Sequence, residues 1–179
     1  MEEIPFTHYL EHLIAALARF GLIVIILPVI PVVIFNLSLS ATLALMTSAF
    51  VIEYGAAPVG IGLGLPPFFV FYVLVCIASG VIFFMFDIFG TLGEHSERIA
   101  KFLAGSCERA RQSKILSKYG IFGLVPCVMT LGFYACPPIA WVFGWRRDLS
   151  ILMTMAGYAA ISIVTILVSL GIFDVLFAK

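Results

Sequence analysis

Residues 52–67 read IEYGAAPVGIGLGLPP, a run of glycine and proline around one carboxylate inside an otherwise apolar sequence. The charged residues nearest to Glu53 are Arg19 and Asp87, each more than thirty positions away. Lipid cannot satisfy unpaired backbone groups, so a broken helix at membrane depth survives only where it lines a cavity or is buried in protein. An ionisable residue beside such a break is a functional-site candidate. We therefore expect this stretch to carry the function.

The composition is that of an integral membrane protein. Of the 179 residues, 63% are hydrophobic and 11% are charged, and the mean hydropathy is +1.17, whereas soluble domains contain about 25% charged residues. The length predicts a single membrane domain over residues 1–179. The net charge is zero, which leaves no basic footprint for a nucleic acid. The predicted partners are the lipid bilayer and a small-molecule, ion or lipid substrate, and so small a chain would suit a homodimer.

Three apolar runs are long enough to cross a bilayer, which takes about 20 residues. They cover residues 20–37, 68–88 and 149–173, and Pro28 and Pro31 are expected to kink the first. Two further apolar segments, 41–67 and 119–145, are interrupted by glycine and proline.

Residues 91–118 hold most of the charge. Thr91 and Glu94 form a capping box, which predicts a helix start. The following apolar residues repeat at helical spacing between lysines and arginines, which favours an amphipathic helix on the cytoplasmic membrane surface. The alternative is a solvated connector helix.

Positive charges predict how the segments cross, because short loops rich in lysine and arginine stay in the cytoplasm. The basic segment 91–118 therefore lies inside. If 119–145 crossed fully, Arg146 and Arg147 would lie outside, whereas a re-entrant hairpin returns them to the inside. The same reasoning makes 41–67 a re-entrant hairpin from the outer face. Nine of the ten basic residues then lie inside.

This arrangement contains the same unit twice, a hairpin followed by a span, over 41–88 and again over 119–173. Inverted repeats of this kind typify secondary transporters, which bind substrate near the midplane between broken helices. A weak sequence echo aligns Pro58 with Pro126. The predicted fold class is an all-α integral membrane protein: an inverted repeat of re-entrant helical hairpin plus transmembrane helix, with an additional N-terminal transmembrane helix and an amphipathic cytoplasmic helix.

At these residues the chain resembles the small multidrug export proteins of archaea and bacteria and, more distantly, the DedA (SNARE-associated, VTT) superfamily. The motifs that carry the resemblance are Glu53-Tyr-Gly-Ala-Ala-Pro58, the glycine-rich run to Pro67, the basic middle loop, and Lys118-Tyr119-Gly120 with the following Gly123. The resemblance implies two re-entrant hairpins packed against spanning helices, and transport of lipids, small ions or drugs. Relatives tend to carry Pro-x-Pro-x-Thr-Gly in the second hairpin, where this chain has only Pro126 before Thr130 and Gly132.

Glu53 is the candidate ion-coupling residue. Desolvation favours the neutral form of a carboxylate, so a carboxylate in apolar surroundings can bind and release a proton near neutral pH. The alternative is an interfacial glutamate that caps the return helix. Carbonyls freed near prolines can coordinate a cation, and glycines permit close backbone approach or simple small-residue packing. The substrate or ion pathway is expected along both hairpins, at Gly55, Pro58, Gly60, Gly62, Pro66, Pro67, Gly123, Pro126, Thr130, Gly132, Pro137 and Pro138.

Three charged residues near the span ends are further candidates. Arg146 and Arg147 could hold a phosphate headgroup or pair with Asp87, or could simply anchor the topology. Asp148 is expected to be the N-cap of the last span.

The sequence does not favour an enzyme. It has no nucleophile–base pair and no phosphate loop, and its histidines and four cysteines lack metal or redox spacing, so neither a cofactor nor a metal site is predicted. The leading hypothesis is a small secondary transporter of the cell membrane, which couples ion or proton movement to export of a small hydrophobic or cationic solute or a lipid phosphate. The alternatives are a lipid scramblase or flippase-like protein and a structural membrane protein without transport.

Overall fold

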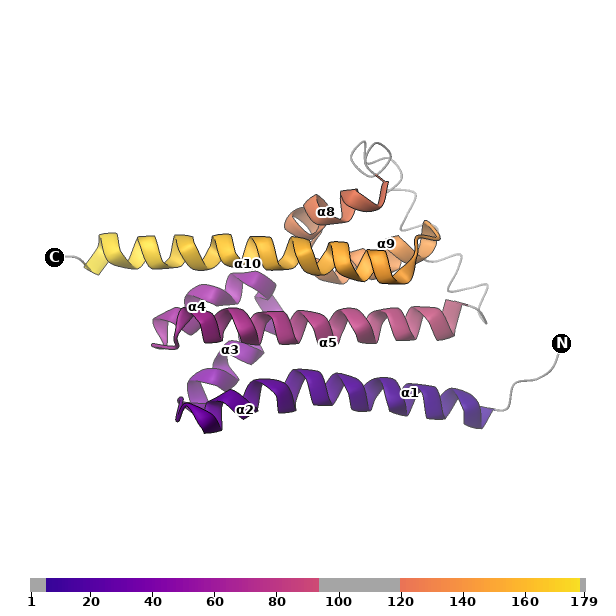
Figure 1. Cartoon of the computed structure of the whole chain (residues 1–179), viewed down its shortest axis with the longest axis horizontal. Helices are drawn as coiled ribbons and strands as arrows, with labels where there is room; N and C mark the ends of the chain where they lie inside the picture. The colour runs from indigo at the N-terminus through magenta and orange to yellow at the C-terminus, as the bar shows by residue number, and fades with distance from the viewer. Residues whose placement is uncertain (1–5, 94–119, 178–179) are drawn as a thin grey trace.

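Three long helices form the body of the molecule. The computed structural model describes residues 6–93 and 120–177, which are helical apart from short turns. The first helix consists of α1 (Phe6–Gly21), a π-helical turn η1 (Leu22–Ile26) and α2 (Leu27–Ile34), and the other two are α5 (Pro67–Gly93) and α10 (Arg147–Phe177). Figure 1 shows α5 between the other two and antiparallel to both.

The first helix begins earlier than the predicted span 20–37 and tolerates its two prolines without a break. Proline lacks the N–H that would bond the carbonyl four residues back. At Pro31 the carbonyl left free is that of Leu27, and the Tyr72 hydroxyl of α5 donates to it at 3.1 Å. Ahead of Pro28, the chain widens into η1, where the Leu27 N–H donates to the Leu22 carbonyl. The π turn and the Tyr72 hydroxyl therefore compensate for the backbone hydrogen bonds that the two prolines cannot make.

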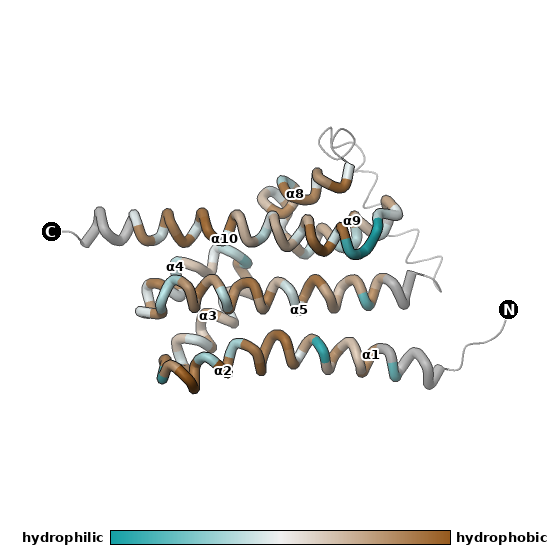
Figure 2. The backbone as a smooth tube through the Cα atoms, in the orientation of Figure 1, coloured by the Kyte–Doolittle hydropathy of each residue, from teal (hydrophilic) through white to brown (hydrophobic). Residues whose placement is uncertain are grey.

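Within the described residues, four helical stretches are long and apolar enough to cross a membrane: Leu13–Ile34, Leu39–Gly62, Pro67–Phe89 and Arg147–Gly171. Large apolar side chains also cover the outer surface, and Val33 and Leu167 are 72% and 62% exposed. Figure 2 shows this apolar character along all three long helices. Water would penalise such a surface, whereas lipid solvates it. The protein is therefore an all-helical, multi-pass membrane protein.

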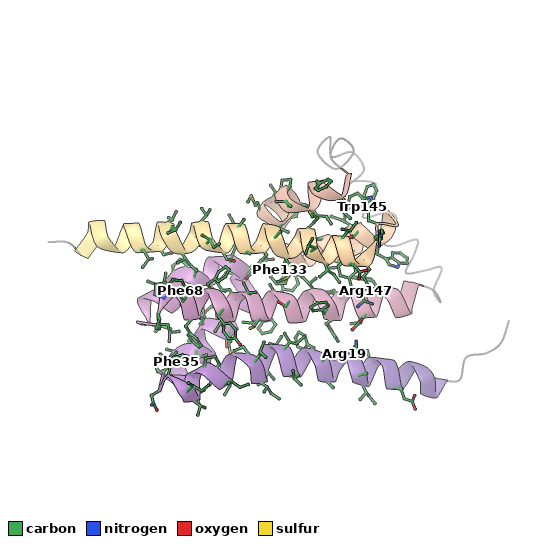
Figure 3. The ribbon with its side chains drawn as sticks, viewed as in Figure 1. Arg19, Phe35, Phe68, Phe133, Trp145 and Arg147 are labelled. Atoms are coloured by element: carbon green, nitrogen blue, oxygen red, sulfur yellow. The ribbon has the colours of Figure 1, made fainter. Side chains whose placement is uncertain are left out.

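The first broken segment, residues 39–62, is not one straight helix. It comprises α3 (Leu39–Ile52), a 3-10 turn η2 (Glu53–Ala56) and α4 (Ala57–Gly62). The break falls at Glu53, whose φ of 52° and ψ of −127° no helix contains. Figure 1 shows that α3 begins where α2 ends and that α4 returns to the same end of the bundle, where α5 begins. Phe35 and Phe68 mark this end in Figure 3, and it is called the Phe68 end below.

The second broken segment, residues 120–142, is built in the same way. It comprises η3 (Gly120–Gly123), α8 (Leu124–Leu131), η4 (Phe133–Ala135) and α9 (Cys136–Val142). Its break falls at Gly132, with a φ of 82° and a ψ of 168°. Figure 1 shows α8 and α9 beside the opposite end of the bundle, where α10 begins. Arg19 and Arg147 mark this end in Figure 3, and it is called the arginine end below.

Matching backbone bonds recur at a spacing of 80 residues. The Leu63, Gly64 and Leu65 N–H groups bond to Val59, Ile61 and Gly60, and the Phe143, Gly144 and Trp145 N–H groups bond to Ile139, Trp141 and Ala140. Gly64 and Gly144 both have positive φ, 79° and 64°. The spacing aligns Pro58 with Pro138, whereas the sequence echo aligned it with Pro126. Prolines also kink and cap helices, so they fix the register less well than the turn glycines do.

Two expectations near the helix ends are wrong. α5 continues to Gly93, so Thr91 lies inside a helix and does not begin one. α10 begins at Arg147, so Asp148 lies in its first turn and is not the N-cap. An acidic residue there still interacts favourably with the helix dipole. The expected amphipathic helix falls almost entirely within residues 94–119, outside the described residues.

Candidate ion-coupling site

The two breaks meet. The Phe133 N–H, directly after the second break, donates to Glu53 Oε2 at 3.2 Å. A Cβ built on Gly132 would lie 2.6 Å from Glu53 Oε2 and 2.7 Å from Cδ. The carboxylate of the first broken segment therefore fills the space that only a glycine leaves in the second. Figure 3 places Phe133 between the Phe68 end and the arginine end, so the contact lies within the bundle and not at its surface ends.

A tyrosine follows each break and bonds the other broken segment. The Tyr54 hydroxyl donates to the Met129 carbonyl of α8 at 3.3 Å, and the Tyr134 hydroxyl donates to the Phe50 carbonyl of α3 at 3.0 Å. The last carbonyls of a helix have no partner within that helix. Each tyrosine satisfies one carbonyl near the C-terminus of the opposite half-helix, so the two segments close each other's ends.

Aromatic rings enclose the junction on the side of α10. Phe133 stacks on Tyr134 with ring centroids 4.3 Å apart, and it also contacts Tyr158 of α10, edge-on at 5.1 Å. Phe133 and Tyr158 are both fully buried, and Tyr54 also lies against Tyr158, at 6.5 Å. This packing holds the backbone N–H of Phe133 in place for the carboxylate.

The junction contains an unpaired carboxylate. Among the described residues, Glu53 has no ion-pair partner, and its one hydrogen bond is the N–H of Phe133. The C-termini of α3 and α8 and the N-termini of η2 and η4 all lie here, so the helix ends contribute partial charges of both signs. The Glu53 carboxylate carries the full charge among the described groups of the junction, so it attracts a proton or another cation and repels an anion.

A model of the family described as "Putative small multi-drug export protein" matches residues 53–164, more than half of the chain. The chain belongs to this family. The match begins at Glu53 and includes Gly132 and Tyr158, so it contains the junction of the two breaks. No curated protein and no solved structure matches the chain. The family description indicates a transporter-like role in place of catalysis, and the more distant resemblance to the DedA superfamily rests on the sequence motifs alone.

Only part of the predicted pathway gathers at the junction of this family member. Glu53 and Gly132 touch, and Gly55 and the buried Pro137 follow the two breaks closely. Thr130 lies in the last turn of α8 but is exposed, with its hydroxyl donating to the Pro126 and Cys127 carbonyls. Pro58 and Pro138 lie near the starts of α4 and α9, where proline fits the first turn of a helix.

The remaining predicted positions lie away from the carboxylate. Gly62, Pro66 and Pro67 surround the turn into α5 at the Phe68 end, and Gly123 precedes α8. Gly60 is a packing position, because a Cβ there would meet Val70 Cγ2 at 2.8 Å. Most of the predicted glycine and proline positions thus lie at helix ends, and few lie close to the Glu53 carboxylate.

Asp87 joins the three long helices at the arginine end. Arg147 of α10 donates to its Oδ1 at 2.5 Å, and Arg19 of α1 lies 3.5 Å from its Oδ2. The Asp87 side chain is 18% exposed, and the two arginines are 49% and 68% exposed. The groups border a cavity of about 320 Å³ between α1 and α5. Arg147 therefore pairs with Asp87, one of the two alternatives for it, while Arg146 is exposed.

Asp87→Asn is expected to lower stability by about 1 kcal/mol, because two arginines then face each other without the carboxylate and most of the pair is solvent-screened. Thermal unfolding in detergent measures the change. Asp148→Asn is the matched control, an exposed acid at the same end, and should change the melting temperature much less. Equal losses in both variants would contradict a specific role for the Asp87 pairs.

Sequence reasoning missed Tyr134, Tyr158 and Phe133. A usable signal was present, because residues 133–138 read FYACPP and residues 53–58 read EYGAAP. The shared tyrosine and final proline give the spacing of 80 residues that the backbone bonds follow. Phe133 contributes only its N–H and its ring, which no motif for a charged or catalytic group would find.

Proposed function

We propose that this protein is a secondary transporter that exports a small hydrophobic cation, with Glu53 as the group that couples export to an ion gradient. The observation that carries the proposal is the contact between the two breaks: a lone carboxylate at the meeting point of two broken helices from opposite ends of one bundle. Transporters with inverted repeats bind substrate and coupling ion at such a point, near the midplane.

The proposal includes two re-entrant hairpins, 39–66 from the Phe68 end and 120–146 from the arginine end. Three observations support an inverted repeat. The broken segments begin and end at opposite ends of the bundle (Figure 1), the following helices α5 and α10 run antiparallel, and the turn bonds match at a spacing of 80 residues. Such a repeat offers two related gates on either side of one site, which alternating access requires.

The proposed substrate class follows from the charge of the junction. The Glu53 carboxylate lies there, and among the described residues no basic side chain pairs with it. A cation can neutralise this site, whereas an anionic lipid phosphate would add to the repulsion. The family description, a multidrug exporter, agrees with a cationic and apolar solute.

The proposed orientation places the arginine end in the cytoplasm of the cell. Arg19, Arg146 and Arg147 lie at this end, α5 ends there, and six further lysines and arginines follow in the sequence between α5 and η3. The positive-inside rule then assigns this end to the cytoplasm. The first hairpin consequently enters from the outer face and the second from the inner face.

Reconstitution tests the function directly. The full chain in liposomes loaded with ethidium is expected to release the dye faster when an inward proton or sodium gradient is imposed than without a gradient. Release at the rate of protein-free liposomes under both gradients would contradict the transporter.

A fluorescent phospholipid in the same vesicles distinguishes the scramblase alternative from the transporter. Its movement between leaflets without any gradient, in the absence of dye export, would favour that function. If neither the dye nor the lipid moves, the result favours a structural membrane protein without transport.

A further inference from the structure

α10 carries a hydroxyl side chain at every fourth position along its buried face. Ser150, Thr154, Tyr158 and Ser162 are all fully buried. The first two are satisfied locally: the Ser150 hydroxyl donates to the Arg146 carbonyl at 3.0 Å and the Thr154 hydroxyl to the Ser150 carbonyl at 2.8 Å. The Tyr158 and Ser162 hydroxyls, by contrast, lie close to each other across one helical turn, but neither makes a well-formed hydrogen bond in the part of the chain that the structure describes.

These two hydroxyls lie beside the junction of the breaks. The Tyr158 ring contacts Phe133 and Tyr54, the residues that follow Gly132 and Glu53. The Glu53 carboxylate lies close enough to act electrostatically on the Tyr158 hydroxyl. Ser162 follows one turn later on α10. The titratable groups that surround the carboxylate are Tyr54 of η2, Tyr134 of η4, Cys136 of α9 and Tyr158 of α10.

A buried hydroxyl without a partner is costly, and native proteins nearly always satisfy such groups with protein, water or an ion. Two such hydroxyls, one helical turn apart and beside a carboxylate, favour a bound polar ligand at this place. Glu53 Oε1 has no donor among the described residues, since the Phe133 N–H bonds Oε2. Three side chains thus present oxygen lone pairs, and the C-termini of α3 and α8 present carbonyls nearby.

We propose that the Tyr158 and Ser162 hydroxyls supply oxygen ligands to a monovalent cation site whose charge is the Glu53 carboxylate. The inference rests on the proposed function and identifies the ligand class of its coupling ion. Transporters coordinate sodium or bind a proton with carboxylates, hydroxyls and unwound backbone carbonyls at helix breaks. Sodium and hydronium share this chemistry, so the two are distinguished by experiment.

Thermal unfolding of the purified full chain in detergent provides the first test. Wild-type protein is expected to melt at higher temperature when sodium replaces choline at fixed alkaline pH, if sodium is the ion. If the proton is the ion, sodium has no effect and the melting temperature rises as the pH is lowered. A wild-type protein that responds to neither overturns the site.

Tyr158→Phe and Ser162→Ala remove only the two hydroxyl oxygens, and Tyr158→Phe keeps the ring against Phe133. Each is expected to raise the half-saturating concentration of the ion about tenfold, the effect of one lost ligand of ordinary hydrogen-bond strength. Ser169→Ala is the matched control, because the Ser169 hydroxyl is nearly buried on the same helix but donates to the Thr165 carbonyl at 2.6 Å.

The sign of the stability change in these two variants distinguishes a cation site from a pair of hydroxyls that bind nothing. If the hydroxyls bind nothing, their removal relieves a buried unsatisfied group, so the variants melt at the same or higher temperature and keep the wild-type ion response. That result overturns the site. If Glu53→Gln abolishes the ion response while both hydroxyl variants keep it, only this inference fails; if Glu53→Gln also keeps the response, the coupling role of Glu53 fails as well.

Discussion

Glu53→Gln should abolish gradient-driven export and leave the protein folded. Glutamine has nearly the shape of glutamate, and its side-chain oxygen can still accept the N–H of Phe133, which lies 3.2 Å from Glu53 Oε2. It cannot bind a proton or neutralise a cation, so the export rate should fall to that of protein-free vesicles under both proton and sodium gradients. Dye release from proteoliposomes measures the rate, and thermal unfolding checks the fold.

Asp148→Asn is the control for loss of a carboxylate, since Asp148 is exposed in the first turn of α10. It should export at the wild-type rate. Glu53→Asp keeps the charge but shortens the side chain by one methylene, so it should retain partial coupling. Export by Glu53→Gln at the wild-type coupled rate would show that Glu53 only accepts the Phe133 N–H at the start of η4. The ion-coupling site would then lie elsewhere in the protein.

The position of the first break was predictable because it depends on local chemistry. An isolated carboxylate followed by glycines and prolines identified Glu53, and the structure places the end of α3 there. The membrane class was predictable for the same reason, since composition and apolar run length decide it. The first helix was longer than expected because Phe6–Arg19 includes charged positions that interrupt the apolar run without breaking the helix.

The partners of Glu53 were not predictable from local chemistry. Phe133 acts through its backbone N–H, and Gly132 acts through the absence of a side chain, so neither residue type suggests a role by itself. The register of the repeat was missed because prolines were aligned. Gly64 and Gly144, which turn the chain after α4 and α9 with positive φ, carry the register better.

Tyr158 and Ser162 illustrate a third limit. A serine or threonine in a spanning helix usually bonds the carbonyl one turn back, as Ser150 and Thr154 do here. Their sequence spacing is therefore uninformative alone. Only the packed structure distinguishes the two satisfied hydroxyls from the two without a well-formed hydrogen bond.

Gly132→Ala is expected to destabilise the protein strongly, because it combines backbone strain with a steric overlap. With φ at 82° and ψ at 168°, Gly132 occupies a backbone region that is essentially restricted to glycine, and forcing another residue into it costs about 1–3 kcal/mol. The new Cβ would also overlap the Glu53 carboxyl group, 2.7 Å from Cδ, and overpacking adds about 1–3 kcal/mol. Because the overlap displaces Glu53, coupled export should be lost together with stability.

Gly64→Ala distinguishes the cost of backbone strain from the cost of the overlap with Glu53. Gly64 has a φ of 79°, close to that of Gly132, but an added Cβ meets nothing within 4 Å. It should therefore show the backbone strain alone and retain export. Glu53→Ala in the Gly132→Ala background removes the overlapping carboxyl group, so the double variant should be more stable than the sum of the single losses predicts. If Gly132→Ala is no more destabilising than Gly64→Ala, and the double variant is additive, then Glu53 does not occupy the space beside Gly132 and the two breaks do not form one site.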